Sequence, residues 1–217
     1  MKIQKIGKRN IILTWSVPDG WNVNVHVIVG EQAVYIIDTG LGSENITEML
    51  DILKIRDKRV IVINTHHHWD HIWGNHMFQG NQIISHSLCR DLIDQKWEEM
   101  IKTKGKYIMG VTKPCLPTMT FEQEIYFPED HIRLFYSPGH TIDSISVVDE
   151  EDNIINIGDN IGDDMTEIMP SLATKKEDYI STLRNYIDLN VKYYVSGHNI
   201  VVDKTVILRL FDIALDK

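Results

Sequence analysis

The chain has 217 residues, of which 43% are hydrophobic and 24% are charged, and its formal net charge is −9 at pH 7. This length and composition are typical of a globular protein with one large or two small domains. The 22 Lys and Arg residues are scattered along an acidic chain, which argues against a nucleic-acid partner because a phosphate backbone requires a clustered basic surface.

The N-terminal residues, Met1 to Val17, contain only a short apolar run and no small-residue cleavage site, so they do not resemble a secretory signal. No run approaches the roughly 18 apolar residues of a membrane span. The two cysteines, Cys89 and Cys115, form no Cys-x-x-Cys pair, which is typical of free thiols in a reducing compartment. We therefore expect a cytoplasmic protein with no membrane partner.

The first predicted elements are two strands and a helix. Runs rich in β-forming residues cover Val23–Val29 and Val34–Asp38, and the Gly30-Glu31-Gln32 segment between them is typical of a hairpin. Ser43 fits the N-cap of a helix that follows. The apolar residues of this helix share one face and are Ile46, Met49, Leu50 and Leu53.

Every residue of Val60–Ile63 is apolar, which indicates a strand buried on both faces, as in a layered α/β structure. This strand leads into the spacing His66-x-His68-x-Asp70-His71. These donors are too crowded for one helix face to present together, whereas a loop at the end of a buried strand can present them. The spacing therefore predicts a metal site.

The middle of the chain predicts one helix, one loop and four strands. The helix is indicated by apolar residues at helical spacing: Cys89, Ile93, Trp97 and Met100. A loop rich in Gly and Pro covers Lys104–Thr120, and loops of this length tend to be functional. The expected strands are Glu124–Phe127, Ile132–Tyr136, Ile145–Val148 and Asn153–Ile157.

The last part predicts a second long loop, Asn160–Ala173, and two helices around a strand at Tyr193–Val195. Thr174 and Glu177 have the spacing of a capping box at the start of the first helix. Its expected inner face is Ile180, Leu183 and Ile187. The second helix starts at about Thr205, and its expected inner residues are Val206, Leu210 and Ile213.

The two halves of the chain follow a similar order of hairpin, helix and strand. Ile37-Asp38-Thr39-Gly40 in the first half has its counterpart in Ile157-Gly158-Asp159 in the second. Two β-rich halves with outer helices predict an α/β sandwich of two sheets with helices on both outer faces.

Three more polar residues follow predicted strands and stand beside glycine: His140, Asp159 and His198. Glycine allows the backbone to turn sharply and to approach a metal closely. Together with the first motif, these residues make a set of five histidines and two aspartates that could converge.

The order of these motifs resembles the metallo-β-lactamase superfamily, and the resemblance extends from Val23 to His198. It implies a single domain over residues 1–217 with a four-layered αβ/βα sandwich of two mixed sheets. It also implies two metal sites that share one bridging ligand, Asp159. The other implied ligands are His66, His68 and His140 for one metal, and Asp70, His71 and His198 for the other. Asp38 matches the family's outer aspartate, which orients a ligand without binding metal.

The donor set favours zinc, since it combines imidazole and carboxylate without thiolate, although iron and manganese accept the same donors. Two divalent ions roughly 3.5–4 Å apart would share a water and lower its pKa toward about 7. We therefore predict a dinuclear hydrolase in which a metal-bridging hydroxide attacks an ester, thioester or lactone carbonyl of a small molecule. Asp70 or Asp159 would be the catalytic residue that orients the nucleophile and handles its proton.

Three other functions remain open. β-Lactam hydrolysis is less favoured, because superfamily members that use a metal-bound cysteine have it where this chain has Asp159. An iron-dependent oxidoreductase is a second alternative, since relatives bind iron for oxygen or sulfur chemistry. A non-catalytic binding module is a third, but it predicts lost ligands and none is lost. The sequence gives no indication of the oligomeric state.

The substrate pocket is expected to be formed by loop residues. The candidates are Trp15, Trp21, Trp69, Tyr107 and Met165. Packing in the core is the alternative for the tryptophans, which bury large apolar surfaces. His67 alternates with His66 and His68 and should point away from the metals.

Overall fold

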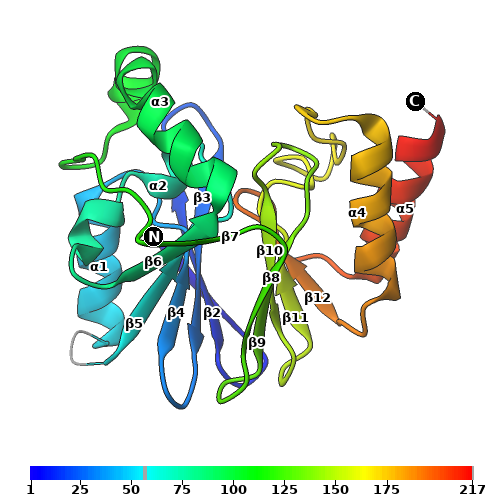
Figure 1. Cartoon of the computed structure of the whole chain (residues 1–217), viewed down its shortest axis with the longest axis horizontal. Coiled ribbons are helices and arrows are strands. Elements are labelled where there is room, and N and C mark those ends of the chain that lie inside the picture. Colours follow the sequence, from blue (N-terminus) through cyan, green and yellow to red (C-terminus); the bar gives the residue numbers. More distant parts are fainter. Residues whose placement is uncertain (56–57, 217) are drawn as a thin grey trace.

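The computed structural model describes residues 1–55 and 58–216 and contains two β-sheets that pack face to face (Figure 1). The first sheet has seven strands in the order of the chain. They are β1 (Lys2–Ile6), β2 (Asn10–Ser16), β3 (Asn22–Val29), β4 (Val34–Ile37), β5 (Val60–Ile63), β6 (Gln82–His86) and β7 (Met119–Phe121). β1 to β4 pair antiparallel and β4 to β7 pair parallel, so the sheet is mixed.

The second sheet has five strands in the order β12-β11-β10-β9-β8. They are β8 (Glu124–Phe127), β9 (Ile132–Tyr136), β10 (Ile145–Asp149), β11 (Ile154–Asn156) and β12 (Tyr193–Val195). The pairs are antiparallel except for β11 and β12, which are parallel. The second sheet is therefore mixed as well, as the family resemblance implied.

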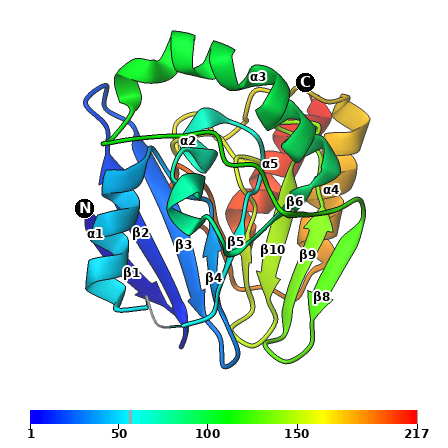
Figure 2. The same ribbon diagram turned by 60° about the vertical axis from the view of Figure 1, so that its left-hand side comes forward.

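Helices cover the outer faces of both sheets (Figures 1 and 2). The α-helices are α1 (Ser43–Leu53), α2 (Trp69–Ile72), α3 (Ser87–Lys104), α4 (Lys176–Asp188) and α5 (Lys204–Asp216). Two short 3-10 segments follow helices: η1 (Asn75–Phe78) comes after α2, and η2 (Gly105–Tyr107) comes after α3. α1 packs on the first sheet, α4 and α5 pack on the second, and α3 lies beyond α2 at one end of the sheets. The fold is the predicted αβ/βα sandwich. Among the described residues, no helix is both long and apolar enough to cross a membrane.

The strands β4 and β5 are buried on both faces, which explains their uninterrupted apolar sequences. Residues on one side of these strands pack with the inner face of α1: Val34, Ile36, Val60 and Val62. The alternate residues pack against the second sheet: Tyr35, Ile37, Ile61 and Ile63. The interpretation of Val60–Ile63 as a doubly buried strand is confirmed.

The N-cap predictions for Ser43 and Thr174 are wrong, because the hydroxyl group of each residue forms a hydrogen bond with a distant loop and does not cap its own helix. α1 has Gly42 at its N-cap, and Ser43 Oγ accepts a hydrogen bond from the Val111 backbone amide at 2.9 Å. α4 has Lys175 at its N-cap, while Thr174 Oγ1 donates to the Gly139 carbonyl at 2.9 Å. These partners come from distant parts of the chain, which local spacing does not reveal.

The inner face of α4 is rotated by about one residue from the predicted face. Its buried residues are Tyr179, Thr182, Leu183 and Tyr186, whereas Ile180 and Ile187 are only partly buried. The tyrosines can turn inward because their hydroxyls have buried partners, the Asn160 carbonyl and Ser146 Oγ. In α5 the most buried residues are Ile207, Leu210 and Ala214.

The sequence pattern does not predict four of the strands, β1, β2, β6 and β7, and β7 overlaps the end of the predicted loop Lys104–Thr120. β1 forms an edge of the first sheet with exposed side chains, β2 lies beside it, and β6 packs on one face with the core of α1 through Ile83 and on the other with the second sheet through Ile84. The tight turn between β1 and β2 uses Gly7 at φ +62°. Asp152, from the second sheet, accepts hydrogen bonds from the backbone amides of Lys8 and Arg9 at 2.7 and 3.0 Å. Tertiary contacts of this kind, rather than local apolar alternation, hold the hairpin in place.

His26 on β3 is a fully buried histidine in its neutral form. Its Nε2 lies 2.8 Å from Asn10 Oδ1, while its Nδ1 has no hydrogen-bond partner in the described part of the chain. Asn10 Nδ2 donates to Asp149 Oδ2 at 2.7 Å, so Asn10 Oδ1 is the acceptor and His26 Nε2 carries the hydrogen. Burial lowers the pKa of His26 from 6.5 to about 4, although the charge of Asp149 opposes this shift.

The His26→Gln variant should lose less stability in acid than the wild type. Between pH 6.5 and about 4 the unfolded chain binds a proton at His26 that the folded chain does not, so falling pH favours unfolding. The proton uptake at His26 should lower the free energy of unfolding of the wild type by roughly 2–3 kcal/mol at pH 4.5. Urea unfolding of both proteins at pH 7 and pH 4.5 measures it, and an equal loss in the two proteins would contradict it.

Candidate metal centre

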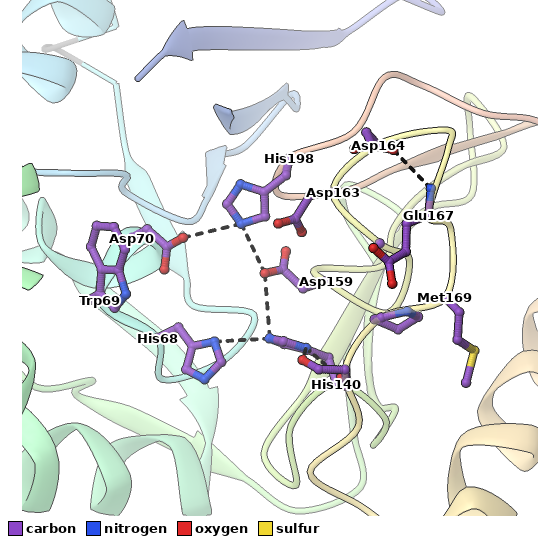
Figure 3. Close-up of a pocket in the computed structure, with 13 residues that line it drawn as sticks. His68, Trp69, Asp70, His140, Asp159, Asp163, Asp164, Glu167, Met169 and His198 are labelled. Atoms are coloured by element: carbon purple, nitrogen blue, oxygen red, sulfur yellow. Dashed lines mark hydrogen bonds and ion pairs between the residues drawn. The ribbon is translucent and has the colours of Figure 1, made fainter. Parts of the chain in front are cut away.

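The candidate site lies where strands of both sheets end. β4 leads to Asp38, β5 leads to the segment from His66 to His71, β9 leads to His140, β11 leads to Asp159 and β12 leads to His198. Because β9, β11 and β12 run in the same direction, their carboxyl ends meet at one edge of the second sheet. Side chains from the two sheets point toward one another across this edge (Figure 3).

The segment after β5 is only partly a loop. His66 and His68 lie before α2, with His68 at its N-cap, whereas Asp70 and His71 belong to α2 itself. The expectation that a loop presents all four donors is therefore corrected. The short helix turns Asp70 and His71 toward a second position, so one segment supplies two groups of donors.

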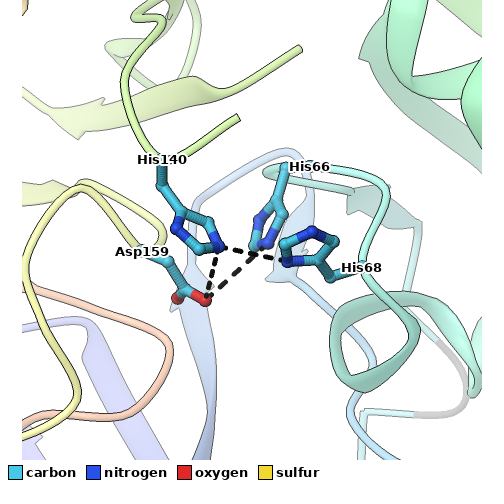
Figure 4. Close-up of side chains that lie close together, drawn as sticks. All are labelled: His66, His68, His140 and Asp159. Atoms are coloured by element: carbon cyan, nitrogen blue, oxygen red, sulfur yellow. Dashed lines mark hydrogen bonds and ion pairs between the residues drawn. The ribbon is translucent and has the colours of Figure 1, made fainter. Parts of the chain in front are cut away.

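The first group contains four residues whose donor atoms lie within 4.8 Å of one another: His66, His68, His140 and Asp159 (Figure 4). His68 Nδ1 is 3.1 Å from His140 Nε2. Asp159 Oδ2 is 3.7 Å from His66 Nε2 and 3.9 Å from His140 Nε2. Three nitrogens and one carboxylate oxygen thus surround one point.

The second group consists of Asp70, His71 and His198, whose donor atoms also lie within 4.8 Å of one another. His198 Nε2 is 3.3 Å from Asp70 Oδ2. Asp159 Oδ2 is 3.2 Å from the Nε2 atoms of both His71 and His198. One oxygen of Asp159 therefore lies between the two groups.

Several donor atoms of the site are buried and have no hydrogen-bond partner among the residues that the structure describes. They are His66 Nε2, His71 Nε2 and Asp159 Oδ1. Buried polar atoms are normally paired, because leaving one unpaired costs about 1–3 kcal/mol. Divalent cations between these atoms would satisfy them, so the residues fit metal binding.

The outer nitrogens of two histidines are held by backbone oxygens. His140 Nδ1 donates to the Ser171 carbonyl at 3.0 Å, and His198 Nδ1 donates to the Asn22 carbonyl at 2.6 Å. Because Nδ1 makes the outer hydrogen bond in each ring, Nε2 is the atom that faces the centre of the site. Gly197 permits the close approach, because a Cβ there would lie 2.3 Å from Asp159 Oδ1.

Asp38 orients His71 and the start of the motif. Its Oδ2 accepts a hydrogen bond from His71 Nδ1 at 2.8 Å, and its two oxygens accept from the amide and the hydroxyl of Thr65, each at 2.7 Å. Asp38 has φ +62°, a conformation that non-glycine residues rarely adopt. These contacts agree with an orienting role and place Asp38 outside both donor groups.

The carboxylates of the site attract positive charge. Burial opposes a charge on His71, but Asp159 and Asp38 outweigh it and raise the pKa of His71 well above its usual value. Burial also opposes a charge on His198, whose pKa is nevertheless raised well above its usual value by Asp159. Burial and the charges of these histidines act in opposite senses on Asp159, and its pKa lies well below its usual value. A negative Asp159 in a buried position favours a cation beside it.

Two histidines of the first group, His66 and His68, are held neutral instead. Burial, followed by the charges of His71 and His68, lowers the pKa of His66 well below its usual value. Burial, followed by the charge of His140, lowers the pKa of His68 to about 4. Neutral imidazoles offer nitrogen lone pairs, which is the form that binds divalent metals.

A cavity of about 450 Å³ opens over both donor groups (Figure 3). Its walls include His68, Asp70 and Trp69 on the side of the first sheet, and the loop residues 162–171 on the side of the second. Asp163 and Glu167 give this loop an acidic face. No sequence motif singles out these two residues; only the length of the predicted loop indicated that the segment borders the site.

Three of the predicted pocket residues form an aromatic wall beside the site. Trp69 stacks on Tyr107 with ring centroids 5.1 Å apart, and Trp21 meets the edges of both rings at 5.7 Å. All three line a depression that also contains Asp70 and His198. Their position agrees with contact to a substrate.

The other two predicted pocket residues lie elsewhere. Trp15 is only 4% exposed and packs in the core between α1 and the first sheet, where its Nε1 donates to Glu48 Oε2 at 2.8 Å. Met165 packs against the core of the second sheet, and Met169 lines the cavity instead. His67 points away from the donors toward Asp143, as expected.

A family model for the metallo-β-lactamase superfamily matches residues 18–198. The chain belongs to the metallo-β-lactamase superfamily. A superfamily relative from Caenorhabditis elegans, the Beta-lactamase-like protein 2 homolog, is 27% identical over 176 residues, which cover 79% of this chain and 54% of that protein. This chain thus spans about half the length of that relative. A Probable metallo-hydrolase from Methanocaldococcus jannaschii is 26% identical over 151 residues, which cover 65% of this chain and 68% of that protein.

Solved structures of metallo-β-lactamases share the fold. The Metallo-beta-lactamase from Pontibacter korlensis has a TM-score of 0.79 at 18% identity, with coverage of 100% of this chain and 99% of that chain. The DIM-1 metallo-beta-lactamase has a TM-score of 0.77 at 16% identity, with coverage of 99% and 97%. Identities this low show the fold alone. The resemblance that the motif order indicated is confirmed for both family and architecture.

The Asp38→Asn variant should bind divalent metal more weakly than the wild type. An amide at this position would turn an NH2 group toward one of the donors on Thr65 or His71 that Asp38 now accepts from. Loss of such an outer partner typically lowers metal affinity about 10–100-fold. Zinc titration of the metal-free proteins measures the change. Asp94→Asn, which alters an exposed carboxylate on α3, is the matched control, and equal affinities in all three proteins would contradict the orienting role of Asp38.

Proposed function

We propose that this chain is a dinuclear metal-dependent hydrolase that cleaves an ester, thioester or lactone of a small molecule. The position of Asp159 Oδ2 carries the proposal, because this oxygen faces both donor groups at 3.2–3.9 Å. The first ion would be held by His66, His68 and His140 and the second by Asp70, His71 and His198. These donors favour zinc, and they also accept iron or manganese. Kinship with a probable metallo-hydrolase supports the hydrolytic class.

The two ions would supply an acidic water and a Lewis acid for the substrate carbonyl. The two aspartates of the site, Asp159 and Asp70, would have the following roles. Asp159 lies between the donor groups and holds them at a fixed separation. Asp70 and Asp159 both border the cavity, so these two carboxylates are the candidates to accept the proton of the nucleophile.

The aromatic wall and the cavity support a small organic substrate. Trp21, Trp69 and Tyr107 offer an apolar surface beside Asp70, against which an acyl chain or a leaving group could pack. Specificity in such sites comes from the placement of a few polar groups around an apolar surface. The loop residues 162–171 close the opposite side of the cavity.

The His68→Ala variant should lose hydrolytic activity while it keeps its fold. It removes a ligand of the first group, and its kcat/KM should fall by more than about 100-fold, since even outer partners of a metal contribute about 10–100-fold. The free energy of unfolding of the metal-free variant should stay within about 1 kcal/mol of the metal-free wild type, because the sheets supply the core. His131→Asn, at an exposed position with φ +51° that suits Asn, is the control.

The assay uses zinc-loaded protein and a panel of aryl esters, thioesters, lactones and β-lactams. Wild-type rates in His68→Ala would refute the assigned ligand set. A preference for lactams would replace the proposed substrate class with the β-lactam alternative. No turnover of the whole panel would contradict hydrolysis and favour the binding module, whereas bound iron with oxidase activity would favour the oxidoreductase.

A further inference from the structure

A second cavity, of about 330 Å³, lies between α3 and the segment that contains the first metal donors. His68 and Trp69 line both this cavity and the larger one over the donor groups, so the two spaces adjoin. Lys96 and Lys104 of α3 also line it. The second cavity therefore brings two ammonium groups to the border of the site.

Lys96 is held in place although it is exposed. Its Nζ lies 3.3 Å from His67 Nε2, and His67 Nδ1 lies 2.8 Å from Asp143 Oδ1. Asp143 is fully buried, and its other oxygen accepts the His67 backbone amide at 2.8 Å. Because the carboxylate accepts the Nδ1 hydrogen, His67 Nε2 has a lone pair that accepts a hydrogen from Lys96. This contact uses one ammonium hydrogen and leaves two for a ligand.

Lys104 lies near Trp69, with its Nζ 6.0 Å from the ring centroid. Within residues 1–55 and 58–216, neither Lys96 nor Lys104 forms an ion pair with a carboxylate. Glu99 lines the same cavity and is not paired with either lysine. The two ammonium groups outnumber the single carboxylate of Glu99 in the lining of this cavity, so its border with the site carries an excess of positive charge.

We propose that Lys96, supported by Lys104, binds a carboxylate carried by the substrate at a distance from its scissile carbonyl. The inference rests on the proposed hydrolytic function and specifies its substrate class. A group with a single negative charge fits best, because Glu99 and the acidic loop residues Asp163 and Glu167 would repel a doubly charged phosphate. Holding Lys96 against His67 reduces the rotamer entropy that an exposed lysine otherwise loses on binding.

The test compares para-nitrophenyl pentanoate with its analogue para-nitrophenyl hydrogen glutarate, in which a carboxylate replaces the terminal methyl group. The quantity measured is the ratio of their kcat/KM values on zinc-loaded protein. Lys96→Met should lower the glutarate preference about tenfold, as expected for loss of one charge-assisted hydrogen bond. Lys104→Met should lower it about 2- to 5-fold, since its ammonium is more exposed. Lys102→Met, at an exposed position of α3 outside the cavity, should keep the wild-type ratio.

A binding measurement separates failure of this inference from failure of the hydrolytic function. The dissociation constant of glutarate itself is measured by calorimetry on the wild type, Lys96→Met and Lys102→Met, both zinc-loaded and metal-free. Weaker binding in Lys96→Met alone supports the subsite even if neither ester is hydrolysed. Equal dissociation constants in the three proteins, or hydrolysis of both esters with an unchanged ratio in Lys96→Met, would overturn it.

Discussion

The buried carboxylate of Asp159 is the interaction that connects the donors of the two halves of the molecule at the site. It lies 3.2 Å from His71 of the first half and from His198 of the second, in a buried position where its negative charge needs cationic partners. An isolated buried carboxylate would be strongly unfavourable, so the surrounding imidazoles and any bound cations stabilise the joint between the sheets. The geometry at this edge follows from that requirement. Strands from both sheets end there, Gly197 leaves room for the carboxylate, and Asp38 fixes the ring of His71.

Much of the architecture could be predicted because it follows from apolar patterning. Val60–Ile63 is buried on both faces, so every position of the strand is apolar and the strand can be recognised from its sequence. The β1–β2 hairpin was missed because its edge strand is exposed and its attachment depends on Asp152, far away in the chain. The N-cap predictions are wrong for the same reason, since Thr174 donates a hydrogen bond to the carbonyl of Gly139, far away in the chain, and not to its own helix.

The candidate donors could be recognised in the sequence, because His and Asp are common metal ligands and glycine stands beside three of them, but their division between two metals came from the family resemblance. The residues that surround the donors could not be predicted from the sequence. Trp15 and Trp21 are similar in sequence context, yet Trp15 is fixed in the core by Glu48 while Trp21 faces the site. Lys96 has no motif, and only the fold brings it to His67. Side chains that shape a pocket vary freely with its loops, whereas the chemistry of metal binding fixes the ligands.

Anomalous diffraction from crystals of the zinc-loaded protein, collected on either side of the zinc absorption edge, is the most direct test of the shared carboxylate. Two peaks roughly 3.5–4 Å apart are expected, one on each side of Asp159 and each next to its own group of histidines. A single peak, or two peaks of which one lies away from His71 and His198, would contradict the dinuclear arrangement.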